Sequence, residues 1–437
     1  MTGMVADRKI GIIYIKKRTP IGWTMLLFFL LPFLMGGLTE LLGLPGFIRY
    51  VMDLILIALC VLILINRSLS VVNKVKPLLM VALVLFVYTL VTYLFNYQSL
   101  FYYIWGVRNN FRYYIAFMAF VMFVCEDEAE RWLELVDIIF YINAALVFFQ
   151  FFAFNVEGDF LGGIFGIVQQ NNGYTIMLLL VVLARSLIKN FSAQENTFVC
   201  MLKCFLAMLV AALEEIKIFS VMFVALIIII CFITRPSRRK IVVVSLSVAI
   251  MMIGAFMLVY VYEEFEGYFS LSNLIEYATK RNYSTAKDIN RISAIRVLAE
   301  EYIPKPHEQL FGLGLGNCDR SDVAIFNSVF YQQHSWLHYT WFSSAMMFLE
   351  TGIIGLGIYL AFFVVVFFSA RRELLRGEAK ESYCRIAMVM SLMSIIIIFY
   401  NASMRIEAGY FAYFIFALPF LSRSNTDSNA KKPKLVD

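Results

Sequence analysis

The residues best suited to chemistry lie in one polar interval, from about Asn290 to Leu356, of an otherwise apolar chain. This interval contains all three histidines of the protein, His307, His334 and His338. A histidine can accept a proton near neutral pH because its unperturbed pKa is about 6.5. We therefore expect any catalysis to take place in this interval.

His334 and His338 are four residues apart, which predicts that they share one face of a helix. Either could be a general base, and the alternative is that the rings rest among the aromatic residues of a membrane interface. No third ligand stands at a suitable spacing, so no metal site is predicted. His307 lies between prolines and a turn, where we expect a structural role.

A short helix over 285–303 is predicted by its apolar spacing, and Pro304 ends it. The helix carries Arg291 and Arg296, which lie about 140° apart and so cannot both face one ligand. Arg296 can either pair with Glu300 on the surface or bind a substrate. Arg291, at the helix start beside the polar loop, is a candidate catalytic residue.

The glycines at Gly312, Gly314 and Gly316 are a weak signal for a phosphate-binding loop, because no Gly-Lys-Ser/Thr ending follows them. We expect instead a tight turn that brings the chain back to the membrane surface.

A few other basic residues stand at helix ends on the face predicted to be outside. Such cations suit a ligand that carries phosphate at the level of the lipid headgroups. Lys217 follows Glu214 and Glu215, so an ion pair is the alternative there. These candidate substrate-binding residues are Arg108, Arg112, Lys217 and Arg405.

The composition predicts the environment of these residues. The chain is 61% hydrophobic and 16% charged, whereas soluble proteins have about 45–50% apolar and about 25% charged residues. The seven cysteines do not suggest a disulfide framework. We therefore expect an all-α polytopic membrane protein with about twelve membrane-spanning helices. The predicted spans are 21–37, 50–65, 77–96, 109–125, 135–154, 173–190, 198–213, 217–234, 241–262, 352–370, 385–401 and 406–421.

Positive charge sets the predicted orientation, because cytoplasmic loops carry the excess of lysine and arginine. With the N-terminus inside, 24 basic residues fall on cytoplasmic segments, and five fall on the short outside loops and the adjoining helix ends. The net charge of +6 thus indicates orientation rather than nucleic-acid binding. We expect spans one to nine, an extracytoplasmic loop with short helices, spans ten to twelve, and a polar cytoplasmic tail, over residues 1–262, 263–351, 352–421 and 422–437.

An apolar stretch at 336–349 is too short to span a membrane. We expect an outer-face helix that lies along the interface or dips into it, with the tenth span starting after Gly352. Ionisable residues deep inside the predicted spans are few and no internal repeat is visible, unlike in a transporter. The active region is therefore expected at the outer membrane surface.

In these features the chain resembles the O-antigen polymerase and O-antigen ligase superfamily of bacterial membrane glycosyltransferases. The motifs cover about a quarter of the chain, and a following Ser-x-Leu favours His334 over His338 as the family's histidine. The matching features are Arg291 opening a helix, the LFGLGLGN turn at 310–317, the stretch at 334–337, and Glu-Thr-Gly-Ile-Ile-Gly at 350–355. Weaker matches are GGIFG at 162–166, Gln-Asn-Asn at 170–172 and the junction at 214–217.

The resemblance implies a GT-C-like helical fold that transfers a glycan from an undecaprenyl-pyrophosphate carrier, with no cofactor and no nucleotide sugar. Pyrophosphate is a good leaving group, and cations stabilise the charge that develops on it. A histidine would take the proton of the acceptor hydroxyl. Aromatic residues such as Trp336 and Tyr339 would offer flat faces to sugar rings.

The expected function is polymerisation of lipid-linked repeat units into a surface polysaccharide, on the outer face of a bacterial cytoplasmic membrane. The lipid bilayer, the lipid-linked oligosaccharide, a chain-length regulator and a flippase are the expected partners, and nucleic acid is not. Within the family, a ligase that moves glycan onto a lipid A core is the alternative. From other classes, a lipid-linked oligosaccharide flippase or other transporter, or a noncatalytic scaffold, remains open.

Overall fold

The structure is a computed structural model that describes residues 20–41, 43–44, 46–66, 69–167, 171–236, 238–261, 280, 288–321 and 323–422. Within these residues every named element is helical. The predicted all-α class is therefore confirmed for the described part of the chain.

Each of the twelve predicted apolar runs coincides with a helix. Among the described residues, six helices (α1, α3, α5, α6, α14 and α15) are long and apolar enough to cross a membrane. These are the features of a multi-pass membrane protein. The helices are α1 (Pro20–Leu41), α2 (Tyr50–Ile65), α3 (Leu69–Phe95), α4 (Leu100–Phe123), α5 (Glu126–Phe154), α6 (Asn172–Phe191), α7 (Thr197–Leu213), α8 (Phe219–Ile233), α9 (Arg238–Val261), α14 (Ser343–Arg376), α15 (Glu381–Tyr400) and α16 (Ala408–Ala417).

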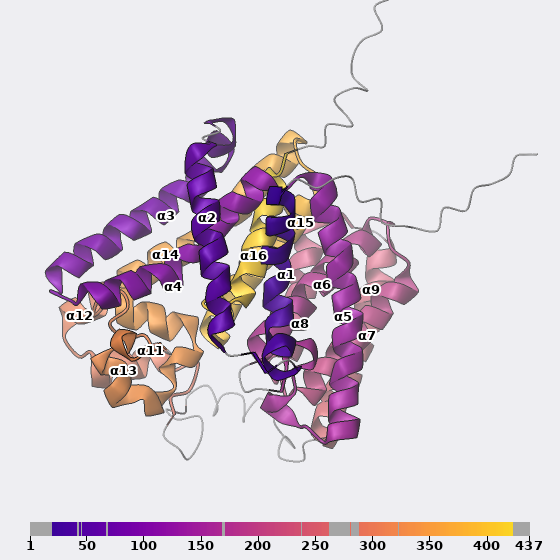
Figure 1. Ribbon diagram of the computed structural model, residues 1–437. Helices are drawn as coiled ribbons and strands as arrows, with labels where there is room; N and C mark the ends of the chain where they lie inside the picture. Colours follow the sequence, from indigo (N-terminus) through magenta and orange to yellow (C-terminus); the bar gives the residue numbers. More distant parts are fainter. Residues whose placement is uncertain are drawn as a thin grey trace, which may run out of the picture.

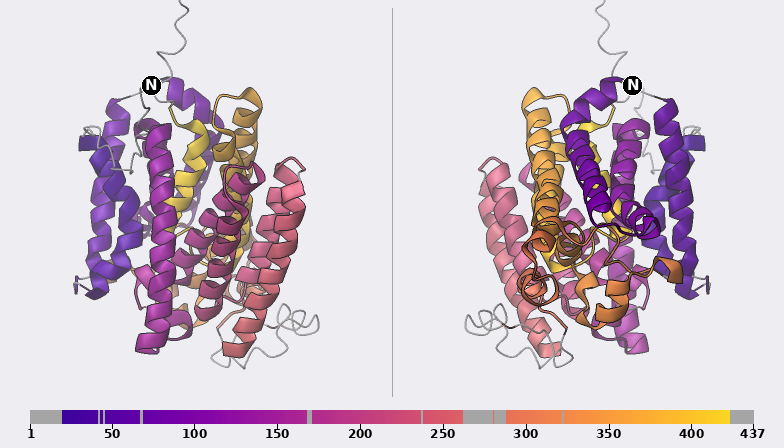
Figure 2. Two further views of the ribbon diagram at one scale, coloured as in Figure 1. Left: turned by 90° about the vertical axis from the view of Figure 1, so that its right-hand side faces the viewer. Right: turned by 90° about the vertical axis from the view of Figure 1, so that its left-hand side faces the viewer.

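These helices lie side by side, and the short helices of the segment 288–342 gather at one end of the bundle (Figure 1). The start of α1 lies at the opposite end in both views of Figure 2. We call the end that carries the segment 288–342 the loop end. The short helices are α11 (Ala294–Val297), α12 (Pro306–Phe311) and α13 (Val329–His334).

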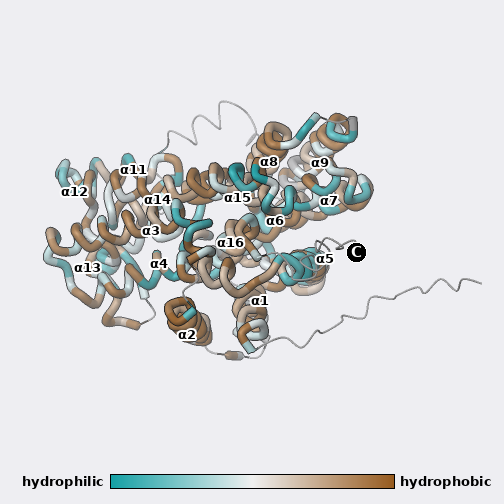
Figure 3. Tube along the Cα trace, turned by 90° about the horizontal axis from the view of Figure 1, so that it is seen from above, coloured by the Kyte–Doolittle hydropathy of each residue, from teal (hydrophilic) through white to brown (hydrophobic). Residues whose placement is uncertain are grey.

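The core lies around α16, in which every residue from Ala408 to Ala417 is buried. Seen from above, α16 lies between α1, α4, α6 and α15, and α2 lies at the rim (Figure 3). At that rim α2 exposes apolar side chains such as Leu54 and Ile57. Exposed apolar side chains on a helix of this kind suit contact with lipid.

A break at Gly352 divides α14 into two parts, because this residue has φ +66° and ψ −173°. A Cβ atom at this position would lie 2.2 Å from the carbonyl oxygen of Leu310. The residues before the break, Ser343–Thr351, are all buried. Within the stretch 336–349, 3-10 turns precede Ser343, and a buried helix then runs from Ser343 to the break at Gly352. The break agrees with the predicted start of the tenth span after Gly352. The location of this stretch at the membrane interface stays a prediction.

The helix predicted over 285–303 is present in its second half. Residues 281–287 lie outside the described residues, and the chain is helical from Ala294. The last turn, Leu298–Tyr302, is a π-helix that ends before Pro304. π-helical turns are uncommon and often lie at functional sites.

The three glycines form a close turn, as predicted. Gly312, Gly314 and Gly316 have φ values of +76°, +101° and +86°, which favour glycine over other residues. A Cβ atom on Gly316 would lie 1.9 Å from the carbonyl oxygen of Tyr102 in α4. The absence of side chains lets this turn pack directly against α4.

Candidate functional site

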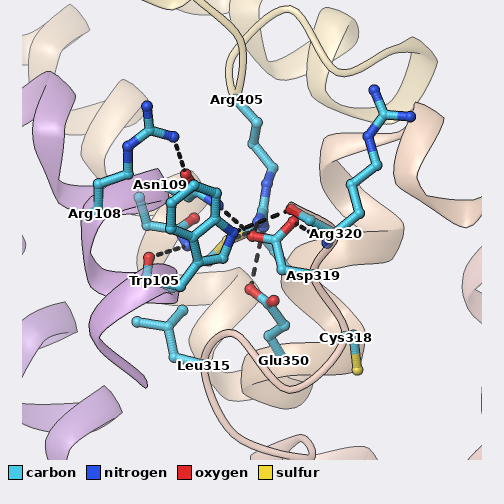
Figure 4. Close-up of polar contacts among 12 residues, drawn as sticks. Trp105, Arg108, Asn109, Leu315, Cys318, Asp319, Arg320, Glu350 and Arg405 are labelled. Atoms are coloured by element: carbon cyan, nitrogen blue, oxygen red, sulfur yellow. Dashed lines mark hydrogen bonds and ion pairs between the residues drawn. The ribbon is translucent and has the colours of Figure 1, made fainter. Parts of the chain in front are cut away.

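A group of buried ionisable side chains meets at the loop end, around Arg405 (Figure 4). One guanidinium nitrogen of Arg405, Nη2, lies 2.9 Å from Oδ2 of Asp319. The other, Nη1, lies 3.3 Å from Oε2 of Glu350. Arg405 thus joins the loop between α15 and α16 to the glycine turn and to the start of α14.

The helix α4 extends this group toward α2. The amide of Asn109 donates to Oδ2 of Asp319 over 2.6 Å, and accepts from Nη1 of Arg108 over 2.6 Å. Arg108 also donates to Oδ2 of Asp53 in α2, from Nε over 3.1 Å and from Nη2 over 2.5 Å. The bonds therefore continue from Arg405 to the outer rim of the bundle.

The same helix extends the group toward α6 through Arg112. Its Nη1 lies 3.2 Å from Oε1 of Glu407, and its Nη2 donates to the backbone carbonyl of Arg405 over 2.9 Å. The hydroxyl of Tyr174 in α6 donates to Oε2 of Glu407 over 2.7 Å. Arg108 and Arg112 contribute together because residues four apart share a helix face. We call the whole set, listed here, the arginine network: Asp53, Arg108, Asn109, Arg112, Tyr174, Asp319, Glu350, Arg405 and Glu407.

The electrostatics of Glu407 show how closely the charges are matched. Burial acts to raise the pKa of this carboxyl, but the charge of Arg112 and the hydrogen bond from Tyr174 outweigh burial and lower the pKa to about 2. The charge of Arg49 acts in the same direction. Glu407 is therefore ionised at neutral pH, which keeps its ion pair with Arg112 intact.

Backbone contacts fix the loops that carry the network. Ser403 donates its hydroxyl to the carbonyl of Gly173 at the start of α6 over 2.9 Å. The hydroxyl of Tyr339 donates to the carbonyl of Cys318 over 2.7 Å, which holds the chain beside Asp319. Buried polar groups that are bonded in this way are held in place, because releasing them would leave them unpaired.

The network has one partly exposed side, at Arg108. The side chain of Arg108 is 22% exposed, whereas those of Arg112 and Arg405 are 5% and 7% exposed. The guanidinium carbon of Arg108 lies 4.8 Å from the ring centroid of Trp105. Trp105 in turn stacks on Phe326, with 5.0 Å between centroids and 12° between planes. The guanidinium carbon of Arg108 also lies 5.4 Å from the ring centroid of Tyr50 at the start of α2. We call Tyr50, Asp53, Trp105, Arg108 and Phe326 the Arg108 edge.

His334 and His338 do not share a helix face, so that expectation is wrong. The helix α13 ends at His334, and His338 has φ +55° between two 3-10 turns. His334 packs against Tyr302 and Phe330, at 5.1 and 4.7 Å between ring centroids. Burial lowers the pKa of His334, which favours the neutral ring.

His338 stacks on Trp341, with 4.1 Å between centroids. Its Nδ1 is buried and has no hydrogen-bond partner among the described residues. Among the described residues, neither histidine forms a hydrogen bond or an ion pair between its side chain and the arginine network. His334 packs on Phe330, whose ring lies 5.4 Å from that of Tyr339 between centroids.

Arg291 and Arg296 do not lie on one helix as predicted, because α11 begins at Ala294 and Arg291 precedes it in a turn. The guanidinium carbon of Arg291 lies 4.3 Å from the ring centroid of Tyr400, the last residue of α15. Arg291 is therefore beside the start of the loop that carries Arg405. Arg296 is exposed, and within the described part of the chain it does not form the ion pair with Glu300 that its spacing allowed.

Lys217 lies outside the arginine network. It pairs with Glu215 over 2.9 Å, which is the alternative that the sequence left open. The neighbouring Glu214 is fully buried, and its carboxyl oxygens have no hydrogen-bond partner among the described residues. Burial raises the pKa of Glu214 well above its usual value.

The two aromatic candidates differ in exposure. Trp336 is 44% exposed and lies 6.4 Å from Tyr302 between ring centroids. Tyr339 is fully buried, so its ring offers no face to a sugar. The expectation that Tyr339 binds substrate is therefore wrong for this structure, in which Tyr339 holds the loop at Cys318.

Sequence reasoning missed the acidic half of the network. Asp53, Asp319, Glu350 and Glu407 each stand near the end of an apolar run or in the polar interval. The arginines of the network stand at the same kind of position, near the ends of apolar runs. This shared position is the sequence signal that could have identified the acids as candidates. The sequence contains nothing that tells which carboxylate meets which arginine.

A second buried ion network lies within α5, α6 and α7. Arg185 pairs with Glu130 over 2.8 Å and also with Asp137. Lys203 pairs with Asp137 over 3.2 Å and with Glu195 over 2.8 Å. The expectation that few ionisable residues lie inside the spans is therefore too simple, because these helices bury Arg185 and Lys203.

Comparison with known proteins adds no identification. No model of a protein family matches the chain, and no curated protein matches it.

Proposed function

We propose that this protein is a membrane glycosyltransferase that polymerises oligosaccharide repeat units from an undecaprenyl-pyrophosphate carrier. One observation carries the proposal: three arginines from α4 and the loop after α15 converge in a buried network at the loop end. Buried ionisable groups in a membrane protein are costly, and they mark functional sites by default. The histidine-bearing segment 288–342 packs at this same end.

The Arg108 edge suits the pyrophosphate of the donor lipid. The buried guanidiniums of Arg112 and Arg405 already have carboxylate partners, so an anion would have to displace these partners. Arg108 is the network arginine with the largest exposed fraction among these three. Its bond to Asp53 is partly exposed and so is the most easily exchanged for phosphate oxygens. The rings of Trp105 and Phe326 beside it offer apolar contact to a sugar.

The reaction balances with residues of the chain. The acceptor hydroxyl forms a new C–O bond to the anomeric carbon, while the bond from that carbon to the pyrophosphate oxygen breaks. The pyrophosphate leaves with the electron pair, and arginine stabilises its charge. The hydroxyl proton goes to a base, for which the neutral ring of His334 is suited. Arg291 and His338 stay candidates for a supporting role.

The proposal includes the topology inferred from charge. Twelve helices span the bacterial cytoplasmic membrane, both termini are cytoplasmic, and the loop end is the outer face. A flippase would deliver the lipid-linked unit to this face, and a chain-length regulator would act on the product. Labelling of single cysteines at the loop end from outside the cell tests the orientation.

The alternatives differ in acceptor and in reaction. A ligase would use the same donor chemistry and place the glycan on a lipid A core. The buried network of Asp137, Arg185 and Lys203 is the observation that favours a transporter, because transporters bury charges inside their helices. A transporter would move lipid-linked oligosaccharide without making a glycosidic bond.

The decisive experiment is turnover by the purified protein in lipid nanodiscs with a lipid-linked repeat unit. A polymerase yields a ladder of chain lengths, whereas a transporter or scaffold yields no longer glycan. A single addition to lipooligosaccharide identifies a ligase. Arg108→Ala should slow the ladder roughly 10- to 150-fold, from the loss of about 1.5–3 kcal/mol for a charged hydrogen bond. Arg376→Ala is the matched control, because Arg376 is 53% exposed at the end of α14 and lies outside the network.

A further inference from the structure

We propose that Tyr302, His334 and Trp336 form a second carbohydrate subsite, which holds the acceptor sugars of the reaction. We call these three residues the aromatic surface. The role as acceptor subsite rests on the proposed function. Carbohydrate binding itself rests only on the geometry and chemistry of the surface.

The rings come from two separate elements that meet at the loop end. Tyr302 is the last residue of the π-helix, and His334 and Trp336 belong to the end of α13 and the turn after it. The rings of Tyr302 and His334 lie 5.1 Å apart at 77°, and those of Tyr302 and Trp336 lie 6.4 Å apart at 64°. Trp336 is 44% exposed, so a ligand can reach it.

The surroundings favour neutral or amino sugars. Sites for such ligands combine aromatic rings with a few polar groups that fix the orientation. Glu300 and Glu301 precede Tyr302, and Gln332 and Gln333 precede His334, and all four are exposed. Carboxylates and amides can bond sugar hydroxyls, whereas the two carboxylates would repel a uronic acid.

The contrast with the Arg108 edge assigns this surface to the acceptor. The aromatic surface is made of ring side chains and contains no lysine or arginine side chain. It therefore suits the part of the substrate that carries no phosphate. The reacting end of the acceptor is a sugar hydroxyl. Phe330 packs against both His334 and Tyr339, and Tyr339 bonds the carbonyl of Cys318 beside the arginine network. One continuous set of contacts therefore joins the two subsites.

The competing occupant is the membrane, because tryptophan and tyrosine also anchor proteins at the headgroup level. Fluorescence of a single tryptophan separates the two occupants. One variant keeps only Trp336, with the others replaced by phenylalanine: Trp23, Trp105, Trp132 and Trp341. The control variant keeps only Trp23, which is 50% exposed on α1. Both are placed in nanodiscs with brominated lipid, and are then titrated with maltotetraose, chitotetraose or tetragalacturonate.

We expect maltotetraose or chitotetraose to change the Trp336 emission, and tetragalacturonate to leave it unchanged. Tyr302→Ala in the same background should weaken this response. Trp23 should respond to brominated lipid and to none of the sugars. The proposal is overturned if brominated lipid quenches Trp336 as strongly as Trp23, or if none of the sugars acts on Trp336.

A second measurement covers the case in which the single-tryptophan variants do not fold. Trp105→Phe and the double variant Trp105→Phe with Trp336→Ala are titrated with the same sugars, and the sugar-dependent change in emission should be present only in the variant that keeps Trp336. An equal change in both variants rejects the subsite. Because neither titration measures transfer, a failure here with an intact polymer ladder refutes the subsite alone. Sugar binding without any ladder refutes the proposed function alone.

Discussion

Removing Arg405 should destabilise the protein more than removing any exposed arginine. Arg405→Met leaves Asp319 and Glu350, both buried, without their cation. Breaking a buried ion pair by deleting one partner costs about 3–5 kcal/mol, because the remaining charge stays buried and uncompensated. For a large domain each kcal/mol lowers the melting temperature by about 2 °C or more, which predicts a loss of roughly 6–10 °C.

The measurement is the apparent melting temperature of purified protein in one detergent, followed by the loss of the monodisperse elution peak on heating. Arg296→Met is the control. Because Arg296 is exposed, this variant should have the melting temperature of the wild type. A triple variant, Arg405→Met with Asp319→Asn and Glu350→Gln, removes the stranded charges and should recover part of the loss. If Arg405→Met and Arg296→Met have the same melting temperature, the ion pairs of Arg405 do not stabilise the protein as proposed.

Three further outcomes follow from individual residues. Folding lowers the pKa of Glu407 to about 2, so its stabilisation is present above the ordinary value near 4.5. This stabilisation is lost as pH falls toward 2. In Glu407→Gln the melting temperature should therefore depend less on pH between about 4.5 and about 2. Glu214 has the opposite sign because burial raises its pKa: its stabilisation is present below about 4.5 and is lost as pH rises. Glu214→Gln should therefore melt higher than wild type at alkaline pH, and an unchanged pH dependence would contradict a buried acid. Gly316→Ala should lower the melting temperature, because its Cβ would lie 1.9 Å from the carbonyl oxygen of Tyr102, whereas Gly357→Ala, with nothing within 4 Å, should not.

The sequence predicted the helices well because hydropathy acts locally. A run of apolar residues forms a helix in a membrane whatever its neighbours are, so each predicted run coincides with a helix. The sequence also named Arg108, Arg112 and Arg405 because few cations stand at helix ends, and the structure brings these three together in one network.

The parts that could not be predicted depend on backbone detail and on partners distant in the chain. The four-residue spacing of His334 and His338 predicts a shared face only if the helix continues, and the left-handed conformation of His338 ends it. The pairing of Arg112 with Glu407 joins residues almost 300 positions apart, which no local pattern encodes. Lys217 shows the opposite case, because its ion-pair partner, Glu215, is only two positions away in the sequence.

The polar contacts of α2 and α6 with their neighbours have a mechanical consequence. Near its start, α6 is bonded through Tyr174 to Glu407. Near its end, Arg185 pairs with Glu130 and Asp137 in α5. These contacts hold α6 in place at both ends. α2 stands at the rim, and its ionic link to the rest is Asp53 with Arg108. An outward movement of α2 would break that ion pair and leave the guanidinium of Arg108 bonded to Asn109 and beside Trp105. Under the proposed function, a donor lipid that enters beside α2 would therefore meet Arg108 without its carboxylate partner.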